Sequence, residues 1–242
     1  MSVDGVLFDI DDTLVDTRSA FVHGLTAVIR AYLPHQGDGK VAEMLEAWRA
    51  DVNGHYRAYT RGELGFVEQR RRRANELHAA YGGPELDDAA FAEWDAVFEE
   101  GFRAGWAAHP DAPAAVDAAL AAGLRVGALS NAGTAYQEDK LRRTGLADRV
   151  PMLVGVDTLG VGKPHPEVFL EACRRLGTEP ARTAYVGDEP DIDAAAAARA
   201  GLVGIWLDRP GGRRATTDDG AAAAAGLPVI RSLDELAGLL GR

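Results

Sequence analysis

The sequence predicts an α/β fold in which a parallel sheet forms the core and an all-helical domain is inserted into it. Short apolar, β-branched runs recur along the second half of the chain and alternate with segments of helical periodicity. Such alternation is typical of a parallel sheet with helical crossovers. Residues 17–106, by contrast, show helical periodicity, many aromatic side chains and little strand signal. A structureless connection of that length is implausible, so an inserted helical domain is the better interpretation.

The elements of the core follow from local patterns. A first strand is expected around residues 6–8, and later strands where apolar and β-branched residues cluster: 124–129, 152–156, 183–186, 203–207 and, more weakly, 228–230. Helices are expected between them, at 112–122, 134–143, 166–175 and 194–200. Ser232-Leu-Asp-Glu235 is a capping box that predicts a last helix. Residues 221–225 are expected to form a surface loop or short helix. The core then comprises residues 1–16 and 107–242, and the inserted domain residues 17–106.

Composition narrows the class of protein. The chain has 242 residues, with 26 cationic and 37 anionic side chains and a net charge of −11, which argues against general nucleic-acid binding. The single cysteine, Cys173, excludes an internal disulfide and lies on an apolar helical stripe, so it is expected in the core. We find neither a signal-peptide pattern nor an apolar run of membrane-spanning length. A cytoplasmic protein without membrane partners is therefore expected.

Carboxylates crowd together directly after the first expected strand, where Asp9-Ile-Asp11-Asp12-Thr13 is soon followed by Asp16. Such charges repel and lose hydration on burial, so a fold tolerates them when a cation sits among them or when they do chemistry. Ligands of open parallel sheets bind outside the carboxyl ends of the strands. A carboxylate such as Asp9 can attack phosphorus there, and Asp11, two residues on, can transfer protons. Thr13 is expected to hold the loop through a hydroxyl bond, and Asp12 and Asp16 are expected to be structural.

Polar residues also follow later strands. Ser130 and Asn131 precede a helix start, so a hydroxyl and backbone N–H groups there would cradle a phosphate; a serine that only caps the helix is the alternative. Lys163 is one of three lysines in a chain with 23 arginines. Its compact ammonium can sit between a phosphoryl oxygen and a carboxylate, and a solvated loop lysine is the alternative. Asp188 ends the fourth strand and converges on Asp9 if the two strands adjoin.

The charge balance of these strand ends favours a metal ion. Four carboxylates, those of Asp9, Asp11, Asp188 and Asp193, face the single ammonium of Lys163. A dianionic phosphate would worsen this imbalance. A hard divalent cation corrects it, and Mg²⁺ typically takes one or two carboxylates, a substrate oxygen and waters.

In this order, Asp9/Asp11/Thr13, Ser130, Lys163 and Asp188/Asp193 resemble the four motifs of the haloacid dehalogenase superfamily of phosphohydrolases. The motifs span residues 3–207, which is effectively the whole core. The resemblance implies a three-layer, Rossmann-like core. It also implies that the helical insertion directly after the first motif is a C1-type cap.

The resemblance also implies a role for each motif residue. Asp9 would be the nucleophile and Asp11 the general acid and base. Mg²⁺ would bind the carboxylates of Asp9 and Asp188 and the backbone carbonyl of Asp11. Asp193 would lie behind these ligands or reach the ion through water, with capping of the next helix as the alternative. Phosphate would be bound by Thr13, Ser130, Asn131 and Lys163, and Lys163 would also take part in catalysis.

The expected function is Mg²⁺-dependent hydrolysis of a small phosphorylated metabolite through an aspartyl-phosphate. A phosphosugar mutase would share these motifs and is the first alternative. A 2-haloacid dehalogenase is disfavoured because that branch lacks an acid at the position of Asp11. A phospho-acceptor signalling domain uses similar residues, but its lysine comes last, whereas Lys163 precedes Asp188. The sequence indicates neither the substrate nor the oligomeric state.

Two further features carry less functional signal. The six histidines are scattered without paired metal spacing, and His165, although close to Lys163, is expected to be a loop residue. Arg70-Arg71-Arg72-Arg73 is the densest charge run, and four consecutive helical residues point all round the helix, so most are expected in solvent.

Overall fold

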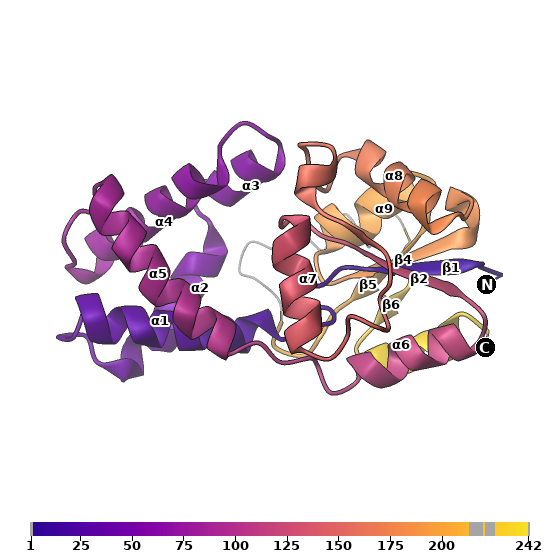
Figure 1. The fold of residues 1–242 in the computed structure, drawn as a ribbon, viewed down its shortest axis with the longest axis horizontal. Coiled ribbons are helices and arrows are strands. Elements are labelled where there is room, and N and C mark those ends of the chain that lie inside the picture. The colour runs from indigo at the N-terminus through magenta and orange to yellow at the C-terminus, as the bar shows by residue number, and fades with distance from the viewer. Residues whose placement is uncertain (1, 213–219, 221–225, 242) are drawn as a thin grey trace. The chain divides into compact units, whose positions relative to one another are not determined.

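The chain divides into two compact units in a computed structural model that describes residues 2–212, 220 and 226–241 (Figure 1). One unit is Thr17–Trp106, and the other is formed by the described residues on either side of it. Residues 221–225, expected as a surface loop or short helix, lie outside the described residues. In the described part of the chain, no helix is long and apolar enough to cross a membrane.

The core unit contains a six-stranded parallel sheet with the strand order β3-β2-β1-β4-β5-β6. The strands are β1 (Gly5–Phe8), β2 (Arg125–Leu129), β3 (Leu153–Val154), β4 (Thr183–Gly187), β5 (Val203–Leu207) and β6 (Val229–Ile230). Every expected strand is therefore present. The order reverses at β1, which pairs with both β2 and β4, and this reversal is where open α/β sheets bind ligands.

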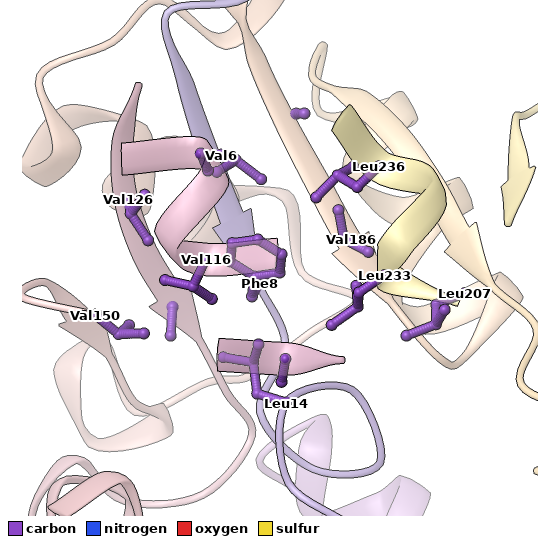
Figure 2. Packing of buried hydrophobic residues seen from close by; sticks show 14 of the residues in the cluster. Val6, Phe8, Leu14, Val116, Val126, Val150, Val186, Leu207, Leu233 and Leu236 are labelled. Atoms are coloured by element: carbon purple, nitrogen blue, oxygen red, sulfur yellow. The ribbon is translucent and has the colours of Figure 1, made fainter. Parts of the chain in front are cut away.

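Helices cover both faces of this sheet, which gives the three layers. They are α6 (Ala112–Ala121), α7 (Thr134–Arg143), α8 (Pro166–Leu176), α9 (Ala195–Arg199) and α11 (Leu236–Leu239). Side chains alternate along β1, so Val6 and Phe8 pack with Val116 of α6 and Leu236 of α11 (Figure 2). Leu7 points to the opposite face, in the cluster that contains residues of α8 and α9. The expected three-layer α/β core is confirmed.

Short turns complete the core helices. A π-type turn over Pro190–Ala194 leads into α9, and a 3-10 turn over Leu233–Glu235 leads into α11. The capping box is formed as expected, because the Ser232 hydroxyl accepts from a backbone N–H and the Glu235 side chain accepts from the N–H of Ser232. Further 3-10 turns lie at Val156–Thr158 and Pro180–Arg182.

The inserted unit is helical throughout its described residues, as expected. It comprises α1 (Thr17–Tyr32), α2 (Val41–Ala50), α3 (His55–Thr60), α4 (Phe66–Tyr81) and α5 (Asp88–Ala104), with a 3-10 turn at Asp38–Lys40. Aromatic side chains form its interior: the rings of Trp94 and Phe98 stack with centroids 5.4 Å apart, and Trp48 lies against both. Large aromatic surfaces supply much burial in a small unit, which explains their concentration in this part of the sequence.

Candidate active site

Two acidic side chains come from adjacent strand ends. Asp9 directly follows β1 and Asp188 directly follows β4, and these strands pair in parallel. The backbone N–H of Asp9 donates to the carbonyl of Val186. Carboxylate oxygens of Asp9, Asp188 and Asp193 lie within 4.8 Å of one another. The strand order thus brings together three of the predicted site residues.

Lys163 lies inside this acidic group, with 3% of its surface exposed. Its Nζ is 2.6 Å from Asp9 Oδ1, 2.7 Å from Asp193 Oδ1 and 2.9 Å from the Tyr185 hydroxyl. Although burial opposes it, the charges of Asp193 and Asp9 raise the pKa of Lys163 well above its usual value. Lys163 is therefore a buried ammonium and not a solvated loop lysine.

The backbone of Lys163 is held by Asn131. The N–H of Lys163 donates to Asn131 Oδ1 at 2.6 Å, and Asn131 Nδ2 donates to the carbonyl of Lys163 at 2.9 Å. A Cβ at Gly162 would collide with the Asn131 amide, so a glycine is needed next to the lysine. The Asn131 side chain thus fixes the lysine loop, and its contact with phosphate stays a prediction.

Asp193 supports the site through both carboxylate oxygens. Oδ1 accepts from Lys163 and, at 3.1 Å, from the Tyr185 hydroxyl, while Oδ2 accepts from the backbone N–H of Glu189 at 3.0 Å. A Cβ at Gly187 would meet the Asp193 carboxylate, which explains the glycine at the end of β4. No side chain caps α9, so the expected alternative that Asp193 caps this helix is wrong.

The electrostatics of the cluster fit a hard cation. Burial and, to a smaller extent, the charge of Asp193 raise the pKa of Asp9 to about 8, against the lowering effect of Lys163. Burial, together with the charges of Asp12 and Glu189, raises the pKa of Asp188 well above its ordinary value. A divalent ion would stabilise the ionised form of both side chains, and oxygen ligands in this number suit Mg²⁺.

The loop after β1 is held differently from the sequence prediction. The Thr13 hydroxyl is buried and has no hydrogen-bond partner among the described residues, so the expected hydroxyl bond is absent. The Thr13 carbonyl instead accepts from Arg209 at 2.9 Å. Asp111 binds the same guanidinium through two contacts of 2.8 Å. Asp12 has the left-handed φ of 59° and donates its N–H to the carbonyl of Val15, which closes a tight turn.

Asp111 is a strongly stabilised anion. Burial opposes ionisation, but hydrogen bonds from Arg209 and from the N–H of Leu233 lower the pKa of Asp111 to about 2. Its carboxylate therefore fixes Arg209, and through it the Thr13 carbonyl. Nothing in the local sequence around Asp111 or Arg209 indicated this link.

The Asp11 carboxylate is not one of the three clustered carboxylates and contacts α7. Its Oδ1 is 2.5 Å from Nζ of Lys140, and its Oδ2 accepts from Nε2 of Gln137 at 2.6 Å. The same Gln137 nitrogen donates to the Ser130 hydroxyl at 2.7 Å. Gly133 occupies the N-cap position of α7, so Ser130 is not a helix cap. Sequence reasoning missed Gln137 and Lys140, although the scarcity of lysine in this chain was an available signal for Lys140.

Tyr185 is a further residue that the sequence analysis missed. It lies in β4, where its ring is part of the core, and its hydroxyl contacts Lys163, Asp193 and the carbonyl of Leu129. A tyrosine in an apolar strand run indicates packing, and its polar contacts depend on strands that are distant in sequence.

The remaining candidates have structural surroundings. His165 is exposed at the start of α8, as expected of a loop histidine, and Cys173 is buried in the core, where burial raises its pKa. In the arginine run only Arg72 is exposed, whereas Arg70 is buried and Arg71 and Arg73 are partly buried, so the expectation that most are solvated is wrong. Arg71 and Arg72 pair with Glu68 on the same helix.

Comparison with known proteins identifies the family of this chain. Residues 3–201 match the haloacid dehalogenase-like hydrolases, which confirms the resemblance inferred from the motifs. A glyceraldehyde 3-phosphate phosphatase of Methanopyrus kandleri is 39% identical over 87 residues, which are 36% of this chain and 37% of that protein. A phosphoglycolate phosphatase of Salmonella typhimurium is 29% identical over 215 residues, or 84% of this chain and 81% of that protein. The chain thus spans little more than a third of the first relative.

Solved structures share the fold over the whole chain. The HAD-hydrolase YfnB from Bacillus subtilis, solved bound to magnesium, superposes with a TM-score of 0.79 at 22% identity, covering 100% of both chains. An L-2-haloacid dehalogenase superposes with a TM-score of 0.72 at 26% identity and covers 99% of both chains. Phosphatases and dehalogenases therefore share this architecture, and the side chains at the strand ends must distinguish them.

Proposed function

The chain belongs to the haloacid dehalogenase-like hydrolases, and we propose that it hydrolyses small phosphate monoesters through an aspartyl-phosphate on Asp9. The observation that carries the proposal is the buried contact of Asp9 with Lys163 at the switch point of the sheet, beside Asp188 and Asp193. Relatives that are named phosphatases support phosphate esters as the substrate class.

In the first half-reaction, a carboxylate oxygen of Asp9 attacks the phosphorus of the ester. The new bond joins Asp9 to phosphorus, the phosphorus–alkoxide bond breaks, and the leaving alkoxide takes a proton from Asp11. Lys163 is already 2.6 Å from Asp9 Oδ1, so its ammonium lies where phosphoryl oxygens would gather. Phosphate contacts from Thr13, Ser130 and Asn131 are part of the same proposal.

In the second half-reaction, water attacks the aspartyl-phosphate. A bond forms between the water oxygen and phosphorus, the bond to Asp9 breaks, and Asp11 accepts the proton that the water loses. Inorganic phosphate leaves and the Asp9 carboxylate is restored. One proton passes out of Asp11 and back into it, so the two half-reactions balance.

The carboxylates of Asp9 and Asp188 and the backbone carbonyl of Asp11 would hold Mg²⁺. Bound there, the ion would offset the carboxylate excess and the charge of the phosphate. Asp193 uses both oxygens for Lys163, Tyr185 and the N–H of Glu189, which favours a supporting role behind the metal ligands.

Dehalogenation and phosphosugar mutation are the competing activities. The similarity to an L-2-haloacid dehalogenase concerns the whole fold, whereas Asp11 supplies an acid that dehalogenation does not need. A mutase would use the same four motifs but return the phosphoryl group to the sugar.

A substrate screen tests the proposal. With Mg²⁺ present, we expect phosphate release from one or more of a panel of sugar phosphates, nucleoside monophosphates and phosphoglycolate. Halide release from 2-chloropropionate without phosphatase activity would contradict the proposal, and so would interconversion of sugar phosphate isomers without phosphate release. Asp148→Asn, at an exposed position of the core unit, is the matched control for substitutions at Asp9.

A further inference from the structure

Two buried polar side chains of α7 contact the carboxylate of Asp11. Lys140 Nζ lies 2.5 Å from Oδ1 and Gln137 Nε2 lies 2.6 Å from Oδ2, so both oxygens accept from side chains of one helix. Positions three apart lie on the same side of a helix, and this side faces the loop after β1. Gln137 also donates to the Ser130 hydroxyl at 2.7 Å.

Burying Lys140 and Gln137 costs free energy, so stability alone does not explain these two residues. Lys140 is 1% exposed and Gln137 is fully buried, whereas the Asp11 side chain is 39% exposed. Burying an ammonium is costly even when it is paired, and an apolar residue of similar size is often as stable. The Oε1 atom of Gln137 is buried without a hydrogen-bond partner in the described part of the chain, which is a further cost.

We propose that Lys140 and Gln137 are positioning residues that hold the Asp11 carboxylate for its reaction with water. Both are donors, and donors contact the ionised carboxylate, which is the form that accepts a proton in the second half-reaction. A carboxylate held at both oxygens has one orientation, and misplacement of a catalytic group by about 1 Å can cost about 10²-fold in rate. Gln137 also donates to the Ser130 hydroxyl, so the same side chain positions both Asp11 and Ser130. This inference rests on the proposed function of Asp11.

The test is pre-steady-state hydrolysis of p-nitrophenyl phosphate by Lys140→Met. Nitrophenolate leaves without help from an acid, so Asp9 should still be phosphorylated, and a burst of about one nitrophenolate per enzyme should precede turnover slowed about 10- to 100-fold. Phosphorylated Asp9 should accumulate and be visible by intact mass. Lys40→Met, which removes an exposed lysine paired with Glu43 on the surface, is the matched control and should leave both phases unchanged.

A double-mutant cycle with Asp11→Asn separates positioning from a general structural effect. In the Asp11→Asn background, Lys140→Met should change turnover less than about twofold, because residues that act through one group are not additive. An undiminished effect in that background would overturn the inference, as would loss of burst and turnover in parallel. Gln137→Met, which leaves no unpaired charge, runs through the same cycle if Lys140→Met fails to fold.

The cycle also distinguishes the inference from the function on which it rests. If Asp11→Asn itself keeps wild-type turnover, the acid–base role of Asp11 is wrong. If Asp11→Asn is slow but neither α7 variant is, the proposed function stands and the positioning role is overturned.

Discussion

The two units of the molecule differ in how their buried charged side chains are balanced by neighbouring groups. In the inserted unit, the Arg70 guanidinium contacts the carboxylates of Asp95 and Glu99 and lies over the Phe98 ring, with 4.6 Å between the guanidinium carbon and the ring centroid. Arg73 similarly donates to the Trp48 carbonyl and lies over the Trp48 ring. These cations are held among acceptors and aromatic faces within their own unit.

At the strand ends of the core unit, the balance is the reverse. Carboxylate oxygens of Asp9, Asp188 and Asp193 lie within 4.8 Å of one another, and two of these side chains, Asp9 and Asp193, pair with the Lys163 ammonium. Burial raises the pKa of Asp9 to about 8. Such an arrangement is unfavourable for stability, because buried carboxylates repel one another. The difference teaches that burial of charge alone does not mark a site. A buried excess of charge of one sign, which lowers stability, is the better indication of a functional site.

Asp9→Asn gives the largest expected effect, because it removes the nucleophile while it relieves part of the carboxylate excess. Turnover of any accepted phosphate ester should fall on the order of 10⁴-fold or more. The melting temperature should stay the same or rise. Steady-state kinetics and a thermal melt measure the two quantities, with Asp148→Asn as control. Activity near that of the wild type would end the covalent mechanism.

Removal of the metal tests whether a divalent cation offsets the excess of carboxylates at the strand ends. Chelation with EDTA should abolish turnover, and added Mg²⁺ should restore it. Asp188→Ala should raise the Mg²⁺ concentration for half-maximal activity more than Asp193→Ala, because both carboxylate oxygens of Asp193 already accept hydrogen bonds from protein donors. Titration of activity against Mg²⁺ gives the ranking. The opposite ranking would mean that Asp193 is the direct ligand.

Arg70→Met should lower stability more than activity. It leaves Asp95 without the Arg70 guanidinium and Glu99 still paired with Arg103. Breaking a buried ion pair costs about 3–5 kcal/mol, and because both carboxylates are partly exposed we expect a loss near the lower end, about 3 kcal/mol. Arg72→Met, at a half-exposed position paired with Glu68, should cost less than about 1 kcal/mol. Urea unfolding followed by tryptophan fluorescence suits this comparison, because three of the four tryptophans lie in the inserted unit. Equal effects of both variants would contradict the structural role of Arg70.

Asp111→Asn gives the smallest expected effect and tests a balanced ion pair within the core unit. The pKa of Asp111 is lowered to about 2, so its ionised form contributes stability above the unfolded pKa of about 4, and this contribution is lost as the pH falls toward 2. Between pH 5 and pH 3 the wild type should lose about 1 kcal/mol more than Asp111→Asn. Urea unfolding at the two pH values measures the difference, and parallel losses would refute the link.

Much of the fold was predictable because its signals are local. Apolar runs marked each strand, including the two-residue β6, and the capping box at Ser232 marked the start of the last helical segment. The order of the four motifs predicted the family. Asp9, Ser130 and Asp188 each directly follow a strand, where a parallel sheet binds ligands. Periodicity and turn chemistry require only neighbouring residues, so the sequence by itself determines them.

The partners of the site residues were decided only by the tertiary structure. The Thr13 loop is held by Arg209 instead of its own hydroxyl, and Asp11 meets Lys140 across 129 positions of sequence. Such contacts depend on the order of strands in the sheet, which no local pattern encodes. Both Lys40 and Lys140 lie in stretches where the sequence shows helical periodicity, yet Lys40 is exposed beside Glu43 and Lys140 is buried against Asp11. The fold alone makes that distinction, because burial is a property of the packed chain and not of the residue.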